Sequence, residues 1–243
     1  MSDRATIAPG DHAGAETLEI MSAAPRYNAW MYDVISPWIG HRVLEVGSGI
    51  GNMSEQILAG GAEHLVLTDM DAWYREQLRA KFADRREVRV DALRLPDPTA
   101  RARFGDHRID TVVALNVVEH IEHDVGALRT MGEIVVPGGR IVVLVPAIES
   151  LYGEMDRELG HFRRYTRPTL RNAFRLAGLR VEELFWFNRV GVAAWWFNGR
   201  IRRVKRIPAH QLKRFDALVP ILRLERLLPL PFGQSLIAIG TPK

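Results

Sequence analysis

Short apolar runs alternate with segments of helical periodicity along most of this 243-residue chain. The apolar runs have the length and composition of buried strands, and turn residues separate them from the helical segments. The predicted strands cover residues 43–46, 64–69, 87–90, 109–115, 141–145, 180–187 and 235–240. This alternation predicts an α/β fold, in which helices cover both faces of a mostly parallel sheet.

Helical spacing marks the segments between these strands. The predicted helices cover residues 16–24, 28–35, 52–58, 72–82, 124–134 and 168–177. We expect Pro25 to separate the first two helices, Asp71 to cap the helix after it and Gly178 to end the last one. Residues 1–15 are small and polar and are expected to be frayed, and residues 97–107 should form a loop or a weak helix.

A glycine-rich turn follows the first predicted strand directly. Gly47, Gly49 and Gly51 separate that strand from a helix that begins at Asn52. Glycines let the backbone bend sharply and approach a ligand closely, and the free N–H groups of the helix point into the same space. Glu45, near the end of the strand, would be costly in an apolar core but suits a positively charged ligand. The turn therefore predicts a site for a nucleotide-like ligand.

Polar side chains stand at the ends of four consecutive predicted strands: Glu45, Asp69, Asp91 and Asn116. In open parallel sheets, ligands bind beyond the carboxyl ends of the strands, near the switch in strand order. Packing alone does not account for four polar groups at one edge of a sheet. We therefore expect these side chains to line the ligand site.

Composition narrows the class of protein only slightly. Apolar residues make up 47% of the chain, enough for the core of one large domain, and the net charge is +4. Moderate positive charge favours anionic partners without choosing among phosphorylated substrates, nucleic acid and acidic membranes. The absence of cysteine excludes disulfides and cysteine nucleophiles. No secretory signal and no apolar run of membrane-spanning length are visible, which predicts a cytoplasmic protein.

Taken in order, these segments resemble the class I S-adenosylmethionine-dependent methyltransferases. The resemblance covers roughly residues 27–187 and a final strand near the C-terminus. It rests on Leu-Glu-Val-Gly-Ser-Gly-Ile-Gly at 44–51, Leu-Thr-Asp-Met at 67–70, Asp-Ala at 91–92 and residues 110–121. Val-Pro-Gly-Gly at 136–139 stands where Leu-Lys-Pro-Gly-Gly is usual. No single piece is decisive, whereas the ordered set is specific.

The resemblance implies a Rossmann-like, seven-stranded, mostly parallel sheet within a single domain over residues 1–243. N-terminal helices would cover 16–40, the Rossmann-like core 42–187 and 235–240, and a helical insertion 188–234. The implied cofactor is S-adenosyl-L-methionine, with S-adenosyl-L-homocysteine as product.

By resemblance, the methionine part of the cofactor would bind at the end of the first strand and beside neighbouring segments. The turn with Gly47 and Gly49 would pass beneath it, with Glu45 close by. Asn116 would line the rim under the sulfonium, and Tyr27 could close over the carboxylate. Tyr27 also belongs to a cluster of aromatic residues that could instead pack on the sheet edge.

The adenosine part falls on the next two strands. Asp69 would accept both ribose hydroxyls, a two-pronged contact that a carboxylate makes well. Met70 would pack on adenine unless it is an ordinary core residue. Asp91 would receive the exocyclic amine, and the N–H of Ala92 would reach a ring nitrogen.

Two other functions use a similar fold. A dinucleotide-binding oxidoreductase typically has Gly-x-Gly-x-x-Gly after the first strand, but here Asn52 occupies the position of the last glycine. Glu45 and the rim over residues 116–120 also favour the methyltransferase. A relative that binds the cofactor without methyl transfer, such as a cyclase, remains open.

For an oxygen nucleophile, a nearby base would take the proton. His120, just after the fourth strand, is the first candidate. His161 and Tyr165 are next, in the stretch 156–165 that follows the fifth strand and would cover the acceptor. Each of the three can equally hold a loop in place. No metal site is expected, because His120 and His123 lack an obvious set of further ligands.

Residues 188–234 stand where the family usually has a short turn between its last two strands. The segment contains Trp195 and Trp196 in an apolar stretch, followed by a basic cluster over 200–206. This pattern suits a lid over the active site, a homodimer contact, or peripheral membrane contact through 188–206 on anionic lipid. Nucleic acid is not expected, because the basic run is short and belongs to no recognisable module.

These features favour a small-molecule or lipid-linked acceptor and, first among the options, O-methylation. C- and N-methylation stay open. The expected location is the cytoplasm, including the inner face of the membrane.

Overall fold

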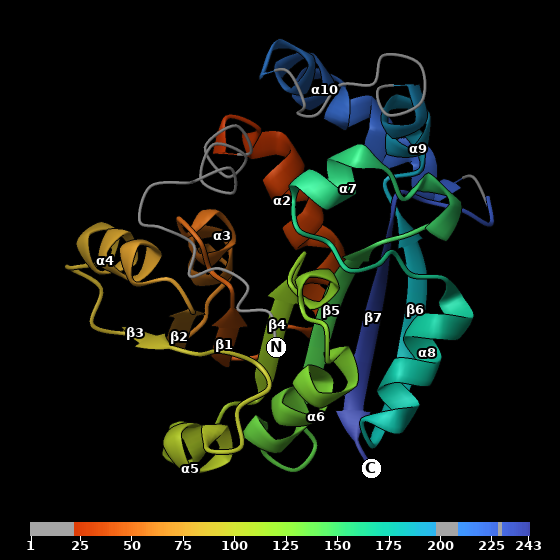
Figure 1. Ribbon diagram of the computed structural model, residues 1–243. Coiled ribbons are helices and arrows are strands. Elements are labelled where there is room, and N and C mark those ends of the chain that lie inside the picture. The colour runs from red at the N-terminus through yellow and green to blue at the C-terminus, as the bar shows by residue number, and fades with distance from the viewer. Residues whose placement is uncertain (1–21, 198–208, 228–229) are drawn as a thin grey trace.

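Within residues 22–197, 209–227 and 230–243, which the computed structural model describes, seven strands form one mixed sheet (Figure 1). The strands are β1 (Arg42–Val46), β2 (His64–Asp69), β3 (Val88–Ala92), β4 (Thr111–Leu115), β5 (Arg140–Pro146), β6 (Leu179–Phe187) and β7 (Ser235–Pro242). Their order is β3-β2-β1-β4-β5-β7-β6, and β7 runs antiparallel to both of its neighbours. The strand order reverses between β1 and β4, where such a sheet is expected to bind its ligand.

Helices cover both faces of the sheet (Figure 1). They are α2 (Pro25–Ile35), α3 (Asn52–Ala59), α4 (Ala72–Lys81), α5 (Ala100–Phe104), α6 (Asp124–Ile134), α7 (Glu154–Glu158), α8 (Arg167–Leu176), α9 (Arg189–Trp196) and α10 (Ala209–Leu222). Short 3-10 turns add η1 (Ser36–Trp38), η2 (Gly105–His107), η3 (Val118–His120), η4 (Glu149–Leu151) and η6 (Arg223–Leu227).

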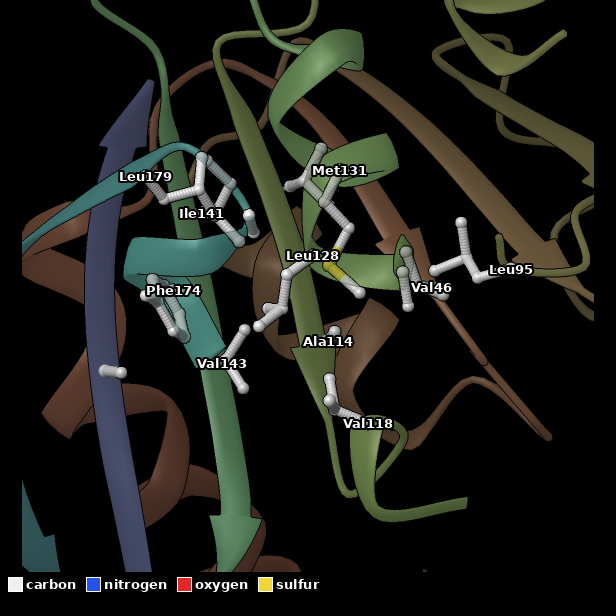
Figure 2. Close-up of a cluster of buried hydrophobic side chains, with 14 of the residues drawn as sticks. Val46, Leu95, Ala114, Val118, Leu128, Met131, Ile141, Val143, Phe174 and Leu179 are labelled. Carbon is white, nitrogen blue, oxygen red and sulfur yellow. The ribbon is translucent and has the colours of Figure 1, made fainter. Parts of the chain in front are cut away.

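The central strands are buried on both faces because their side chains alternate between two apolar layers. In β4, Val112 and Ala114 pack with residues of α6 and α8, whereas Val113 packs with residues of α2 and α3. Figure 2 shows the first of these layers, with Met131 of α6 and Phe174 of α8 facing the sheet. Two covered faces account for the continuous apolar runs in the sequence.

The predicted elements agree with the observed ones to within a few residues, with an informative difference at the start of α2. α2 begins at Pro25, three residues before the predicted start at residue 28, because a proline fits the first helical turn, where its missing N–H leaves no bond unmade. Residues 97–107 contain α5, whose Phe104 is fully buried, so tertiary packing stabilises a helix that lacks clear periodicity. Residues 16–21 of the first predicted helix lie outside the described residues.

The insertion is tied to the core at its two ends and along α2. Where it leaves β6, Asn188 has a φ of 58° and caps α9 by accepting a hydrogen bond from the Gly191 N–H. Its amide also donates to Gln234, just before β7, so the two ends of the insertion are joined. Buried Asp216 of α10 accepts a hydrogen bond from the Tyr27 N–H at the start of α2. The helices between β6 and β7 are therefore an integral part of the fold.

Candidate functional site

The glycine turn crosses the carboxyl end of β1, where the strand order reverses. Gly47, Gly49 and Gly51 have positive φ angles of 66°, 53° and 81°. At Gly47 the turn also passes so close to the chain after β4 that a Cβ there would lie 2.8 Å from a methyl carbon of Val117. Conformation and space both require glycine at this position. The first N–H groups of α3, which begins at Asn52, lie next to the turn.

Asp69 joins the end of β2 to the glycine turn. One carboxylate oxygen accepts a hydrogen bond from the Gly49 N–H at 3.1 Å, and the other accepts one from the Asp71 N–H at 2.9 Å. Burial raises the pKa of Asp69, against the lowering effect of both hydrogen bonds. Each oxygen keeps a further lone pair. Asp69 can therefore still accept hydrogen bonds from two neighbouring hydroxyl groups of a ligand.

Glu45 lies in the middle of the sheet, beside the turn. Its neighbours in register are Leu67 of β2 and Val113 of β4, and Ser54 of α3 donates a hydrogen bond to its carboxylate. Burial raises the pKa of Glu45 to about 7, although the hydrogen bonds from Ser54 and Ser48 oppose the shift. A cation bound at this edge would favour the ionised form. The position fits the predicted proximity to a positively charged ligand.

Met70 is 62% exposed directly after β2, so its side chain is not part of the core. An exposed methionine beside Asp69 is available to pack on a flat ring. The alternative of ordinary core packing does not fit this exposure.

Asp91 and Ala92 end β3, where Ala92 lies opposite Asp69 in register. The Asp91 carboxylate accepts hydrogen bonds from the Ala92 N–H at 2.8 Å and from Arg103 of α5 at 3.2 Å. Arg103 also donates to the Ala92 carbonyl and, at 2.8 Å, to Asp97. A ligand amine that donated a hydrogen bond to the Asp91 carboxylate would therefore share this acceptor with Arg103. The sequence did not single out Arg103.

Tyr27 lies in an aromatic cluster. Its ring centroid is between 5.7 and 6.2 Å from those of Trp30, Phe187 and Phe215. Burial raises the pKa of Tyr27 to about 12. The packing interpretation fits this environment, and closure over a cofactor carboxylate stays a prediction.

Asn116 follows β4 with a φ of 54°, a left-handed conformation that asparagine tolerates better than most residues. Its N–H donates to the Leu144 carbonyl at 2.8 Å, which fixes the backbone at the end of the strand. The side chain is exposed at the rim and is available to a ligand.

Beyond β4, the turn η3 lies against the loop that follows α7. The rings of His120 and His161 meet edge to face, with centroids 4.6 Å apart. His161 Nδ1 lies 2.9 Å from Asp156 Oδ1, and Arg164 Nε donates to the same oxygen at 2.8 Å. Desolvation and the neighbouring His161 lower the pKa of His120 to about 4, so its imidazole is neutral at neutral pH. The structure therefore brings two of the three predicted catalytic residues together.

Tyr165, the third, is part of the buried core. Its side chain is 2% exposed, and its hydroxyl donates to the Asp124 carboxylate at 2.8 Å. Burial and the charge of Asp124 raise the pKa of Tyr165. This environment favours a structural role and corrects the expectation of a base at this position.

Sequence reasoning missed several residues that shape the site. From α4, Lys81 donates to the Ile50 carbonyl at 3.1 Å and Arg75 to the Met70 carbonyl at 2.8 Å, so both brace the loops around the ligand edge. Their partners are backbone carbonyls, which leave no side-chain pattern to detect. Glu119 is fully buried, which raises its pKa to about 8. Its place beside His120 in the sequence was visible, but its contacts were not.

The strand order, the glycine turn and the rim carboxylates define a class I S-adenosylmethionine-dependent methyltransferase. Residues 15–184 match a family described as a methyltransferase domain, and the chain belongs to this family. Its cofactor is S-adenosylmethionine.

Among curated proteins, the chain is similar to the ubiquinone/menaquinone biosynthesis C-methyltransferase UbiE of Pseudomonas paraeruginosa, with 31% identity over 113 residues. The match covers 43% of this chain and 41% of that protein, so it spans about two fifths of the length of the relative. The similarity therefore concerns part of each chain.

Two solved structures illustrate the range of chemistry on this fold. A geranyl diphosphate methyltransferase in complex with S-adenosylmethionine has a TM-score of 0.63 and 11% identity, with 97% of this chain and 92% of that chain covered. The [4+2]-cyclase SpnF has a TM-score of 0.58 and 14% identity, with 88% of this chain and 81% of that chain covered. At these identities the likeness shows the fold alone.

The residues of the rim fit the cofactor chemically. Asp69 can accept from the two hydroxyls of a ribose, and exposed Met70 can pack on adenine. Buried Glu45 offers negative charge beside the turn, where the cofactor carries its cationic groups. In the part of the chain that the structure describes, no helix is both long and apolar enough to cross a membrane.

Proposed function

We propose that this protein transfers the methyl group of S-adenosylmethionine to a small-molecule or lipid-linked acceptor, with an oxygen as the most favoured nucleophile. The observation that carries the proposal is the meeting of Asp69, Glu45 and the glycine turn at the switch in strand order, with His120 and His161 paired at the adjacent rim. C-methylation is the second candidate, because UbiE, with which the chain shares part of its length, is named as a C-methyltransferase.

The bound cofactor supplies an activated, electrophilic methyl group. The work left to the protein is alignment and exclusion of water. Asp69 and the glycine turn hold the donor at the carboxyl ends of β1 and β2. Neutral His120 can accept a hydrogen bond from an acceptor hydroxyl at the rim. A pKa near 4 makes His120 a weak base at neutral pH, so removal of the hydroxyl proton needs help from another group.

The insertion supports an acceptor with an apolar part. Of the twelve large apolar residues that are exposed in the described chain, nine lie between β6 and β7: Val190, Trp196, Phe197, Leu218, Ile221, Leu224, Leu227, Leu230 and Phe232. Apolar side chains next to a basic run suit an interfacial position on anionic lipid, where a lipid-linked acceptor would be found. The basic cluster at 200–206 lies outside the described residues.

A screen of hydroxyl-bearing acceptors with mass detection of both products tests the proposal. We expect each turnover to give one S-adenosylhomocysteine and one acceptor heavier by a methyl group. Binding of S-adenosylmethionine with no methylated product from any hydroxylated, carbon or amine acceptor would instead favour a relative such as a cyclase. Methylation at carbon alone would show that the protein is a methyltransferase and that its nucleophile is carbon instead of oxygen.

A further inference from the structure

Three potential metal ligands meet at the rim beyond β4. Glu119, His120 and His161 each offer one nitrogen or oxygen atom, and these atoms lie within 4.8 Å of one another. Glu119 and His120 belong to η3, whereas His161 comes from the loop after α7. Two segments far apart in the sequence therefore converge on one point, which the spacing of His120 and His123 did not reveal.

Glu119 is the unusual member of this cluster. It is fully buried, and among the described residues neither of its carboxylate oxygens has a hydrogen-bond partner. The positive charge of Arg164 acts on Glu119, but its guanidinium donates to Asp156 and to the Ala147 carbonyl. Burying a carboxylate without a partner is costly. A cation held between Glu119 and the two histidines is the partner that the carboxylate lacks.

Both imidazoles are held in an orientation that suits a metal ligand. The His161 Nδ1 is engaged by the Asp156 carboxylate, which leaves Nε2 as the nitrogen with a free lone pair. The ring of His120 packs edge to face against the ring of His161, with centroids 4.6 Å apart. A carboxylate or carbonyl behind a histidine is the usual arrangement that orients a metal-binding imidazole.

We propose that Glu119, His120 and His161 bind a divalent first-row transition-metal ion, with Asp156 orienting His161. Two imidazoles and one carboxylate suit ions such as Mn²⁺, Fe²⁺, Co²⁺ or Zn²⁺, whereas Mg²⁺ and Ca²⁺ prefer sets of oxygen ligands. His120 is exposed, so the ion keeps coordination positions toward solvent and the rim.

The ion also offers a way to activate the acceptor, and this consequence rests on the proposed O-methylation. An acceptor hydroxyl that coordinates the ion has a lowered pKa and releases its proton to solvent water. The resulting oxyanion forms the new bond to the methyl carbon, and the carbon–sulfur bond breaks with its electron pair staying on sulfur. His120 then acts as a ligand of the ion and not as the base.

Metal binding is tested without any acceptor. The full-length chain, treated with a chelator, is titrated with Co²⁺ by calorimetry and visible absorption. We expect one ion per chain for the wild type. Replacement of an outer-sphere partner commonly weakens metal binding by about 10–100-fold, so loss of a direct ligand in Glu119→Gln or His161→Ala should weaken it by at least about 100-fold. His123→Ala, an exposed histidine outside the cluster, is the matched control and should bind like the wild type.

Binding of S-adenosylhomocysteine, measured on the same proteins, reports whether each variant is folded. If His161→Ala does not fold, Glu119→Gln decides, because it keeps the shape of the side chain. Absence of stoichiometric Co²⁺ binding to the wild type, or equal affinity in Glu119→Gln and His123→Ala, would overturn the site. A failed acceptor screen together with intact Co²⁺ binding would leave the metal site standing and remove only the proposed O-methylation.

Discussion

At the scale of single residues, Asp69 should carry much of the affinity for the cofactor. Its carboxylate links the end of β2 to the glycine turn by a hydrogen bond, and each oxygen keeps a lone pair for one of the two ribose hydroxyls. A hydrogen bond to a charged group contributes about 1.5–3 kcal/mol. We therefore expect Asp69→Ala to weaken S-adenosylmethionine binding by about 10–100-fold or more, measured by calorimetry.

The neighbouring acid Asp71 provides the control for this measurement. It caps α4 through the Trp73 N–H at 2.8 Å, so Asp71→Ala should lose about 1 kcal/mol of folding stability and little cofactor affinity. Wild-type affinity in Asp69→Ala would refute the assignment of the ribose to this residue.

Glu45 predicts a pH dependence of stability in the absence of cofactor. Its carboxyl has an ordinary pKa of 4.5 and a pKa of about 7 in the folded protein because it is buried. Between these values the folded state holds a proton that the unfolded state has released, so the free energy of unfolding falls as the pH rises from about 4.5 to 7. At about 1.36 kcal/mol per pH unit, the loss is on the order of 3 kcal/mol.

Glu45→Gln removes this titration while keeping an oxygen that can accept from Ser54. Denaturant unfolding of both proteins at pH 5 and pH 8 measures the effect. We expect the variant to gain stability relative to the wild type mainly at pH 8. An equal difference at the two pH values would contradict the raised pKa.

At the scale of elements, the contact between α10 and α2 predicts how the insertion is held. Asp216 is 7% exposed and accepts a hydrogen bond from the N–H of Tyr27, in the first turn of α2. The N-cap residue of α2, Ala24, makes no side-chain hydrogen bond to the helix, so Asp216 acts in place of a cap. Asp216→Ala should therefore cost about 1–2 kcal/mol of stability, the typical range for a lost helix cap, in denaturant unfolding.

The matched control is Asp33→Ala. Asp33 is exposed and forms an ion pair with Arg223, at 2.7 Å, between the same two parts of the chain. Exposed pairs contribute about 0–1 kcal/mol. Equal losses in the two variants would mean that Asp216 acts only as another surface charge.

At the scale of the whole molecule, the apolar residues of the insertion predict binding to anionic vesicles. Trp196 and Phe197 are both about half exposed, at 49% and 47%, next to the basic cluster in the sequence. The double variant Trp196→Ser plus Phe197→Ser should sediment less with phosphatidylglycerol vesicles than the wild type, and added salt should weaken both. Trp195 is not suitable for this test, because its ring packs against Arg164 at 4.5 Å.

Leu176→Ser serves as the control, since Leu176 is 48% exposed on α8, outside the insertion. If the wild-type protein does not sediment with the vesicles at low salt, the predicted membrane contact is wrong. A concentration-dependent change in mass in the ultracentrifuge, lost in the double variant, would point to a dimer contact instead.

Local patterns in the sequence determined where the strands, the helices and the glycine turn follow one another along the chain. Those signals are periodicity, caps and glycines, which act over a few neighbouring residues. They also placed Glu45, Asp69, Asp91 and Asn116 at strand ends, because the ends of parallel strands follow directly from the strands. The cofactor was therefore readable from the sequence through its resemblance to a known family.

Only the tertiary structure decided which side chains meet across the fold. It packed Tyr27 against Phe187 and Phe215 and buried Tyr165 in the core, because burial of a ring depends on segments distant in the sequence. It also set Glu119 and His120 beside His161, and gave Asp91 a partner in Arg103. These contacts join residues that share no local spacing, so no pattern along the chain could have predicted them.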